Sequence, residues 1–199
     1  SLYVLYMTLI LGSIWSKKNN IIKTTYNQIK IRSQPKKPNA LKISSSEKKH
    51  TRAYWGNATW ILFHTIAAKI NDDYYKKNYK FVWDFIKRCC SELPCPYCRT
   101  HAMAYIKTIN IRQVITRSQL ERVLFDFHNT ANKHANNPQF AWSNISKYKK
   151  SHTKNVFINF ENKFFRTFYN SREFSQWLRN SFKKDFYIFR NAVFRHMNT

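Results

Sequence analysis

Four cysteines stand within ten residues of one another, and the 199-residue sequence has no other cysteine. Two of them begin and end the tetrapeptide Cys-Pro-Tyr-Cys at residues 95–98, and the other two are the adjacent Cys89 and Cys90. A disulfide-rich secreted scaffold would spread its cysteines to link distant segments, so this clustering excludes that class. A Cys-x-x-Cys pair at a helix start favours a thiolate, because unpaired backbone N–H groups and the helix dipole lower the pKa of its first thiol. The pair therefore indicates dithiol–disulfide exchange.

Structural zinc is the main alternative for this cluster. Cys95, Cys98 and His101 have the spacing C-x2-C-x2-H, and Cys89 or Cys90 could supply a fourth ligand. A zinc site normally takes its ligands from two separated elements, whereas these residues would crowd one helix junction. We therefore predict no metal site, and we interpret His101 as a helix-surface or capping residue.

Two further groups of residues have helical spacing and polar chemistry. Trp60 and His64 are four residues apart, so they share one face of a helix. His128 and Asn132 share a face in the same way, with Asn129 beside them. Each group alone is typical of core packing or of a helix end. Together they offer aromatic planes and polar side chains near a redox-active pair, which predicts a site for a flat aromatic cofactor with polar edges.

The elements that must position these residues are helical. Only two glycines occur, which excludes a Rossmann fingerprint or another glycine-rich phosphate loop, while 43% hydrophobic residues exclude a wholly disordered chain. Apolar spacing predicts four helices joined by short links, and hence an all-α, antiparallel four-helix bundle. The predicted helices span residues 55–70, 75–90, 96–107 and 118–136, the last with Ser118 and Glu121 as its capping box. Residues 142–150 are predicted as a short fifth helix. Residues 171–196 are predicted as a further amphipathic helix that starts at Ser171 with Glu173 in its first turn.

The net charge of +25 is concentrated in two flanks. Residues 17–52 carry eleven Lys and Arg against one acid, and residues 147–199 carry twelve against three, whereas residues 53–146 carry twelve against six. We expect the basic flanks mainly to keep the protein soluble, so that removing the C-terminal one would leave the chemistry of the bundle intact. Contact with nucleic acid is the alternative that this charge leaves open.

The N-terminal flank begins with an apolar run, Leu2–Trp15. It is shorter than the roughly 20 residues that span a bilayer, and it lacks the basic n-region and cleavage site of a secretory signal. We expect at most a weak membrane anchor there, followed by a linker over residues 19–49. The predicted organisation is an apolar run and basic linker at 1–50, a bundle domain at 51–150, and a basic aromatic extension, expected to be helical, at 151–199.

Three segments carry a resemblance to a known family. They are WGNATWILFHTIAA at residues 55–68, LPCPYCRTHA at residues 93–102, and HNTAN at residues 128–132 followed by NPQF at 137–140. In this order and spacing they resemble the Erv/ALR family of FAD-dependent sulfhydryl oxidases, above all its members from poxviruses and other large DNA viruses. The resemblance covers about residues 53–150.

The resemblance implies a four-helix bundle with a short fifth helix and FAD in the bundle mouth. It implies that Cys98 is the flavin-proximal cysteine, which forms the charge-transfer thiolate, and that Cys95 is the outer cysteine attacked by substrate. The cofactor contacts that it implies are Gly56, Trp60, His64, His128, Asn129, Asn132, Lys133 and Trp142, with Tyr148 as a further candidate.

This chain departs from the family at two positions. Asn57 stands where the family commonly has Arg, and Asn137 where it often has Lys. Both family positions lie near the charged part of the cofactor. We therefore expect another base, Lys133 or Arg99, to neutralise the pyrophosphate.

The activity that the resemblance implies is a thiol oxidase that forms disulfides in protein substrates. Electrons would pass from a thiol-containing protein, or a small thiol relay protein, through Cys95–Cys98 to FAD and then to O2, giving H2O2. We expect Cys90 to be a small buried hydrophobe, with a shuttle role left open for Cys89. The resemblance also implies a homodimer and a viral protein of the host cytoplasm or virion. A basic nucleic-acid or virion-binding helical protein with a degenerate redox site is the alternative.

Overall fold

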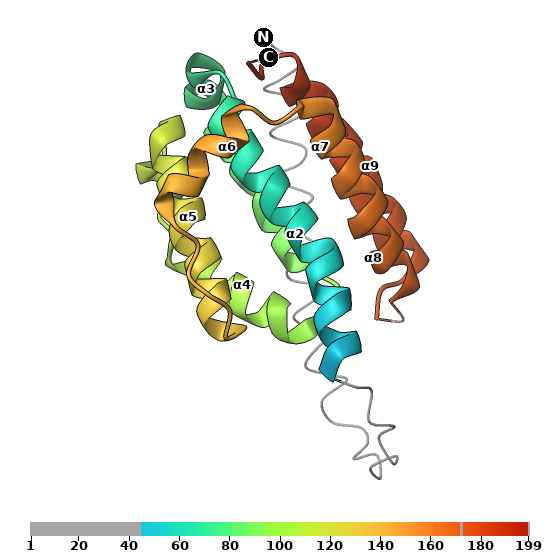
Figure 1. Cartoon of the computed structure of the whole chain (residues 1–199). Helices are drawn as coiled ribbons and strands as arrows, with labels where there is room; N and C mark the ends of the chain where they lie inside the picture. Colours follow the sequence, from blue (N-terminus) through green and yellow to red (C-terminus); the bar gives the residue numbers. More distant parts are fainter. Residues whose placement is uncertain (1–44, 172, 199) are drawn as a thin grey trace, which may run out of the picture. The chain divides into compact units, whose positions relative to one another are not determined.

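The computed structural model describes residues 45–171 and 173–198, with side chains from residue 52 onward (Figure 1). These residues are almost entirely helical, and an isolated bridge between Ile70 and Met197 is the one β pairing among them. The predicted all-α class is therefore confirmed. The apolar run Leu2–Trp15 and the linker up to residue 44 lie outside the described residues. Within the described part, no helix combines the length and apolar character needed to cross a bilayer.

The four predicted bundle helices are all present. They are α2 (Ser45–Lys69), α3 (Asp72–Ser91), α4 (Pro96–Thr108) and α5 (Arg117–His134). α2 is longer than its apolar pattern predicts, so residues 45–49 are helical and are not part of a linker. α5 packs on both α2 and α4, and α3 packs on α4.

Local capping explains where these helices begin. The side chain of Asn71 accepts a hydrogen bond from the Tyr74 N–H at 3.0 Å and caps α3. α4 has Cys95 at its cap and a proline at its first position, where the missing N–H costs nothing. α5 is capped by Thr116, which forms both halves of a capping box with Gln119. The predicted box of Ser118 and Glu121 is therefore wrong, because the backbone is already helical at Ser118.

The predicted fifth helix is a 3-10 turn, η2 (Trp142–Ile145), followed by one α-helical turn, α6 (Ser146–Lys149). Both turns lie beyond α5, and α6 packs on α2. Ile145 and Tyr148 are the buried side chains that hold this segment against the bundle.

Beyond the bundle, the chain folds into α7 (Thr153–Phe160), the π-helical turn η3 (Glu161–Phe165), α8 (Arg166–Asn170) and α9 (Gln176–Phe194). The predicted helix start at Ser171 is wrong, since Ser171 ends α8 and the hydroxyl of Ser175 caps α9 by accepting the Leu178 N–H at 3.2 Å. Between the two helices, the Glu173 carboxylate and the buried Phe174 ring both contact the Arg99 guanidinium.

The C-terminal helices share a core with the bundle. Figure 1 shows α2 between α5 on one side and α7 on the other, and α9 packs on α3. Phe160, Phe164, Phe168, Phe182 and Phe186 are fully buried in this layer. The expectation that the C-terminal flank is a mainly solubilising extension is therefore corrected, because its removal would expose this aromatic core.

Candidate functional site

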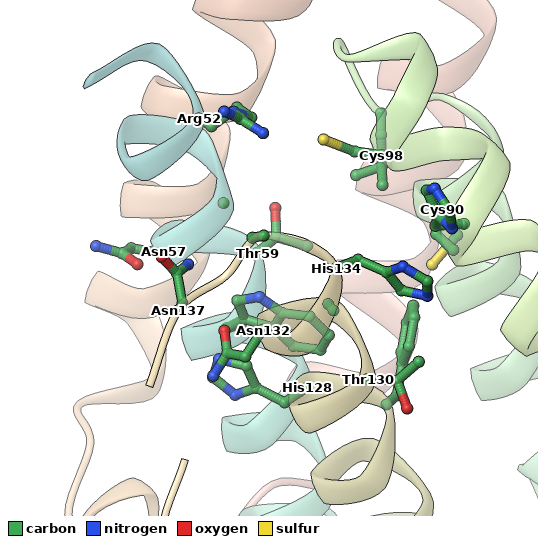
Figure 2. Close-up of a pocket in the computed structure, with 18 of the residues that line it drawn as sticks. Arg52, Asn57, Thr59, Cys90, Cys98, His128, Thr130, Asn132, His134 and Asn137 are labelled. Carbon is green, nitrogen blue, oxygen red and sulfur yellow. The ribbon is translucent and has the colours of Figure 1, made fainter. Parts of the chain in front are cut away.

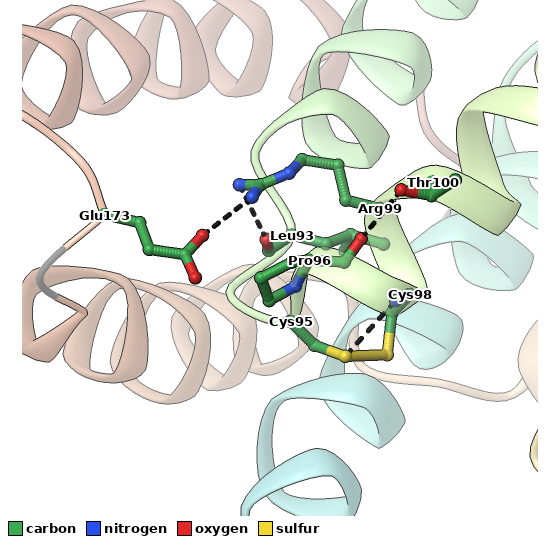
Figure 3. The surroundings of a disulfide bond; sticks show 7 residues. All are labelled: Leu93, Cys95, Pro96, Cys98, Arg99, Thr100 and Glu173. Carbon is green, nitrogen blue, oxygen red and sulfur yellow. Dashed lines mark hydrogen bonds and ion pairs between the residues drawn. A yellow bond between two sulfur atoms is a disulfide. The ribbon is translucent and has the colours of Figure 1, made fainter. Parts of the chain in front are cut away.

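The structure joins Cys95 and Cys98 in a disulfide at the start of α4 (Figure 3). Their Cα atoms are 5.2 Å apart, and the Cys98 N–H lies 3.2 Å from the Cys95 sulfur. Both side chains are half-buried. An N–H donor and a helix N-terminus both stabilise negative charge, so this position suits a thiolate at Cys95 in the reduced pair.

Arg99, directly after the disulfide, holds the redox loop to the C-terminal helices. Its guanidinium donates to the Glu173 carboxylate at 2.7 Å and to the Leu93 carbonyl at 3.4 Å, as Figure 3 shows. The same group lies 5.0 Å from the centre of the Phe174 ring. One side chain therefore ties the residues before Cys95, the first turn of α4 and the connection between α8 and α9.

A cleft of about 460 Å³ opens beside Cys98, between α2, α4 and α5 (Figure 2). Cys98 lines it, whereas Cys95 does not. The disulfide therefore has one sulfur at the cleft and its other sulfur outside the lining. The volume is within the range of about 300–1,000 Å³ that is typical of cofactor and small-molecule sites.

Aromatic side chains form much of the cleft wall. Trp60 and Phe63 come from α2, and Phe127 comes from α5. The Trp60 ring stacks on the His128 ring, with centroids 4.2 Å apart and planes inclined by 8°, and it meets Phe127 edge to face at 5.1 Å. The predicted pairing of α2 and α5 residues is thus formed, with Trp60 and His128 in direct contact.

His64 lies behind Trp60 and His128 and is almost completely buried. Its Nε2 is 3.0 Å from Nδ1 of His128, and its ring stacks on Tyr148 and Phe140. Burial, the neighbouring His128 and Lys147 lower the pKa of His64 to about 3. Burial and Lys147 lower the pKa of His128 to about 4, so both imidazoles are neutral at pH 7.

Two asparagines of α5 fix the segment that follows this helix. The Asn129 amide accepts from the Phe140 N–H at 2.7 Å and donates to the Phe140 carbonyl at 3.1 Å. Asn132 donates to the Pro138 carbonyl at 3.0 Å and also lines the cleft. Asn129 therefore holds Phe140 against the two histidines from outside the cleft lining, and its predicted contact with the cofactor stays a prediction.

The other predicted cofactor residues divide into two groups. Gly56 lines the cleft, and a Cβ atom added to it would meet nothing within 4 Å. Lys133 is exposed and lies outside the cleft lining, and Trp142, 47% exposed, packs on Phe125 and the Arg122 guanidinium. The structure therefore brings Gly56, Trp60, His128 and Asn132 to the cleft, while Lys133 and Trp142 stay predictions.

Sequence reasoning missed three cleft residues with basic side chains, Arg52, His101 and His134. The half-buried His101 ring lies 3.9 Å from the His134 ring with planes inclined by 32°, and it meets Tyr97 edge to face at 4.2 Å, so this side chain on the surface of α4 also lines the cleft. The spacing could have predicted two of these residues. His101 is three residues after Cys98 and Arg52 is four before Gly56, so each lies on the same helix face as a predicted site residue.

Cys89 and Cys90 are free thiols buried in the core at the end of α3. Burial raises the pKa of both thiols, which keeps them protonated and unreactive at neutral pH. Cys90 reaches the cleft lining and Cys89 does not. In the described part of the chain, no group of three His, Cys, Asp or Glu side chains is placed to hold a metal ion.

Comparison with known proteins adds independent information. The model of the Erv1 / Alr family matches residues 57–151. The chain is 38% identical over 88 residues to a candidate FAD-linked sulfhydryl oxidase of Invertebrate iridescent virus 3, a match that covers 44% of this chain and 60% of the relative. It is 30% identical over 105 residues to an FAD-linked sulfhydryl oxidase of a Kenyan isolate of African swine fever virus, which covers 52% of this chain and 87% of the relative.

A candidate FAD-linked sulfhydryl oxidase of Frog virus 3 is 29% identical over 87 residues, a match that covers 42% of this chain and 58% of the relative. The chain thus spans somewhat less than two thirds of the iridescent virus 3 and frog virus 3 proteins. No solved structure matches the chain at a comparable level. The family match and the extent of the African swine fever virus match show that this chain belongs to the Erv1/Alr family.

Proposed function

We propose that this chain is an FAD-linked sulfhydryl oxidase that forms disulfides in protein substrates. One observation carries the proposal: the Cys95–Cys98 disulfide lies between solvent and an aromatic cleft, with Cys98 in the cleft lining. Relatives named FAD-linked sulfhydryl oxidases support it. Those relatives come from viruses, so we also propose a viral protein.

The residues present fit a flavin. The cleft volume of about 460 Å³ and the wall of Trp60, Phe63 and Phe127 suit a flat aromatic ring system. The open space beside Gly56 leaves room along α2 for a ligand to approach the backbone. Nδ1 of His64, behind the cleft wall, is buried and has no hydrogen-bond partner among the described residues.

Cys95 is the sulfur that an incoming thiolate attacks in this proposal. The attack forms a bond between the substrate sulfur and Cys95 Sγ, and it breaks the Cys95–Cys98 bond, so that Cys98 leaves as a thiolate. A second substrate thiolate then attacks the substrate sulfur of the mixed disulfide and releases Cys95. The substrate loses two electrons and two protons, and the pair Cys95–Cys98 becomes a dithiol.

The position of Cys98 in the cleft lining supports its role as the cysteine that passes these electrons inward. The flavin, when bound, would accept the two electrons and transfer them to O2, which gives H2O2. His64 and His128, both neutral at pH 7, would hold the aromatic wall in place without adding charge behind it.

We propose that a separate thiol protein donates electrons directly to Cys95–Cys98, and that Cys89 and Cys90 do not relay them. Cys89 and Cys90 are buried with raised pKa values, and the 199 residues contain no further cysteine. The exposed Tyr97 side chain and the neighbouring Pro96 leave the Cys95 side of the loop open to such a partner. We also propose that the protein forms a homodimer, as the family resemblance implies.

Purified protein tests the proposal directly. We expect a yellow protein that releases FAD on denaturation and consumes O2 when dithiothreitol is added, with one H2O2 formed per disulfide. The Cys95→Ser variant is the matched control, because it should keep the flavin and lose O2 consumption. A colourless protein that consumes no O2 with added FAD would reject the proposal and favour the nucleic-acid or virion-binding alternative.

A further inference from the structure

The charge of the cleft is an observation that the proposed chemistry does not use. Among the described lining residues there is no Asp or Glu, and Arg52 is the one Lys or Arg. The lining also holds the imidazoles of His101, His128 and His134, of which that of His128 is neutral at pH 7. A cleft with this composition favours an anionic ligand, because the attraction between opposite charges strengthens where surrounding groups displace water.

The sequence suggests Arg99 or Lys133 as the partner of the FAD pyrophosphate, but neither side chain lines the cleft. Arg99 binds the Glu173 carboxylate and the Leu93 carbonyl on the far side of the redox loop. Lys133 follows Asn132 on α5 but lies outside the lining. A pyrophosphate held partly out of water still needs a cationic partner.

Arg52 has the position for this role. It precedes Gly56 by one turn of α2, so the two residues share a helix face, and the space beside Gly56 is open. Figure 2 shows Arg52 on the α2 wall, across the cleft from Cys98, with Asn57 and Asn137 beside each other at the rim. The redox end and the cationic end of the cleft are thus on different walls.

We propose that Arg52 binds the pyrophosphate of FAD, with the amides of Asn57 and Asn137 as neutral hydrogen-bond donors beside it. This inference rests on the proposed function. It assigns to Arg52 the positive charge that the amides of Asn57 and Asn137 cannot supply. Arg52 also interacts with other groups of the chain. Its guanidinium has five N–H donors, so it can keep such a contact and still donate two parallel hydrogen bonds to phosphate oxygens.

Flavin binding by the full-length apoprotein tests the inference without using turnover. The dissociation constants of FAD and of riboflavin, which lacks phosphate, are measured by quenching of flavin fluorescence. We expect Arg52→Gln to weaken FAD binding about 10- to 100-fold, the usual effect of losing hydrogen bonds to a charged group, and to leave riboflavin binding unchanged. Arg52→Lys should bind FAD with an affinity between those of the wild type and of Arg52→Gln. It keeps the positive charge but cannot donate two parallel hydrogen bonds to phosphate oxygens.

Lys107→Gln is the matched control, since it removes one positive charge from an exposed residue of α4 outside the cleft lining and should leave both dissociation constants unchanged. Equal weakening of FAD and riboflavin by Arg52→Gln would overturn the inference, because it would indicate a change in the cleft and not a lost phosphate contact. Unchanged FAD binding in Arg52→Gln would also overturn it. Wild-type protein that binds neither flavin would overturn the proposed function, and this inference with it.

Discussion

The cleft and the C-terminal layer are both rich in aromatic side chains, yet they are built for different tasks. In the cleft, Trp60 stacks on an imidazole and Phe127 stands near polar groups. In the C-terminal layer, Phe164 and Phe182 are fully buried and meet each other edge to face at 5.6 Å. Aromatic content alone therefore does not distinguish a site from a core. The cleft differs from the core in three ways: it has a neutral histidine in its wall, it encloses an open volume, and the reactive Cys98 lies in its lining.

α2 belongs to both regions and couples them. One face of this helix carries Trp60 and Gly56 toward the cleft, and the Trp55 ring meets the Phe164 ring edge to face at 6.3 Å. A defect in the phenylalanine layer should thus lower the stability of the whole unit, whereas a defect at the cleft edge should act on chemistry.

Replacement of either redox cysteine should have the largest effect. Cys95→Ser and Cys98→Ser should both reduce O2 consumption with dithiothreitol to background, because no disulfide remains for substrate thiolate to attack. Both variants should retain the melting temperature of the reduced wild-type protein, since both side chains are only half-buried.

Cys89→Ala is the control for this pair. Its thiol is fully buried, protonated and outside the cleft lining, so the variant should keep its turnover with dithiothreitol and with a thiol protein. Selective loss of turnover with the thiol protein would show that Cys89 takes part in electron transfer to the redox pair.

The phenylalanine layer should respond in the opposite way. Phe186→Ala should lower the free energy of unfolding by about 3–5 kcal/mol, because the side chain is fully buried and leaves a large cavity. Denaturant unfolding measures this loss, and turnover per folded molecule should remain near that of the wild type. Phe194→Ala on the same helix is the control, with a ring that is 41% exposed and an expected loss below about 1 kcal/mol. Equal losses in the two variants would contradict the proposed layer.

The histidine pair behind the cleft should make stability depend on pH. The folded-state pKa values are about 3 for His64 and about 4 for His128, below the ordinary value of 6.5. Between pH 6.5 and about 4 the unfolded chain binds protons that the native chain does not, so the free energy of unfolding falls as pH falls. Each group contributes a slope of up to about 1.4 kcal/mol per pH unit.

Melting curves between pH 7 and 4.5 check this dependence. His128→Asn should reduce the slope, because it removes one of the two suppressed titrations. His152→Asn is the control, since it changes an exposed histidine and keeps a side chain that can cap α7. A slope in His128→Asn equal to that of the wild type would show that the pair is not responsible.

Much of the bundle could be predicted from the sequence, because local signals specify it. Apolar spacing located α3 and α4 within a few residues, and Pro96 marked the start of α4. The prediction failed at the α5 cap, where Thr116 and Ser118 are both acceptable cap residues and only the backbone decides between them. Helix starts are set by a competition between neighbouring caps, which composition does not resolve.

The site was only partly predictable, for a different reason. Trp60, His64 and His128 have spacing within single helices, and their meeting follows from a bundle. The segment 153–170 and the Arg99–Glu173 contact depend on packing between residues that are far apart in sequence. The place of Arg52 in the cleft lining was not predictable for the same reason, because one basic residue among many in a charged flank carries no local signal of the cleft that it faces.

The smallest predicted effect concerns the contact that joins the two regions at the redox loop. The side chains of Arg99 and Glu173 are 26% and 43% exposed, so solvent weakens their attraction, and a double-mutant cycle with Arg99→Gln and Glu173→Gln should give a coupling energy of about 0.5 kcal/mol. Arg99→Gln alone should destabilise more than Glu173→Gln alone, because it also removes the bond to the Leu93 carbonyl and the contact with Phe174. Urea unfolding measures all four proteins of the cycle. Equal losses in the two single variants would mean that Arg99 acts only through Glu173, and that the redox loop and the C-terminal layer are joined there by charge alone.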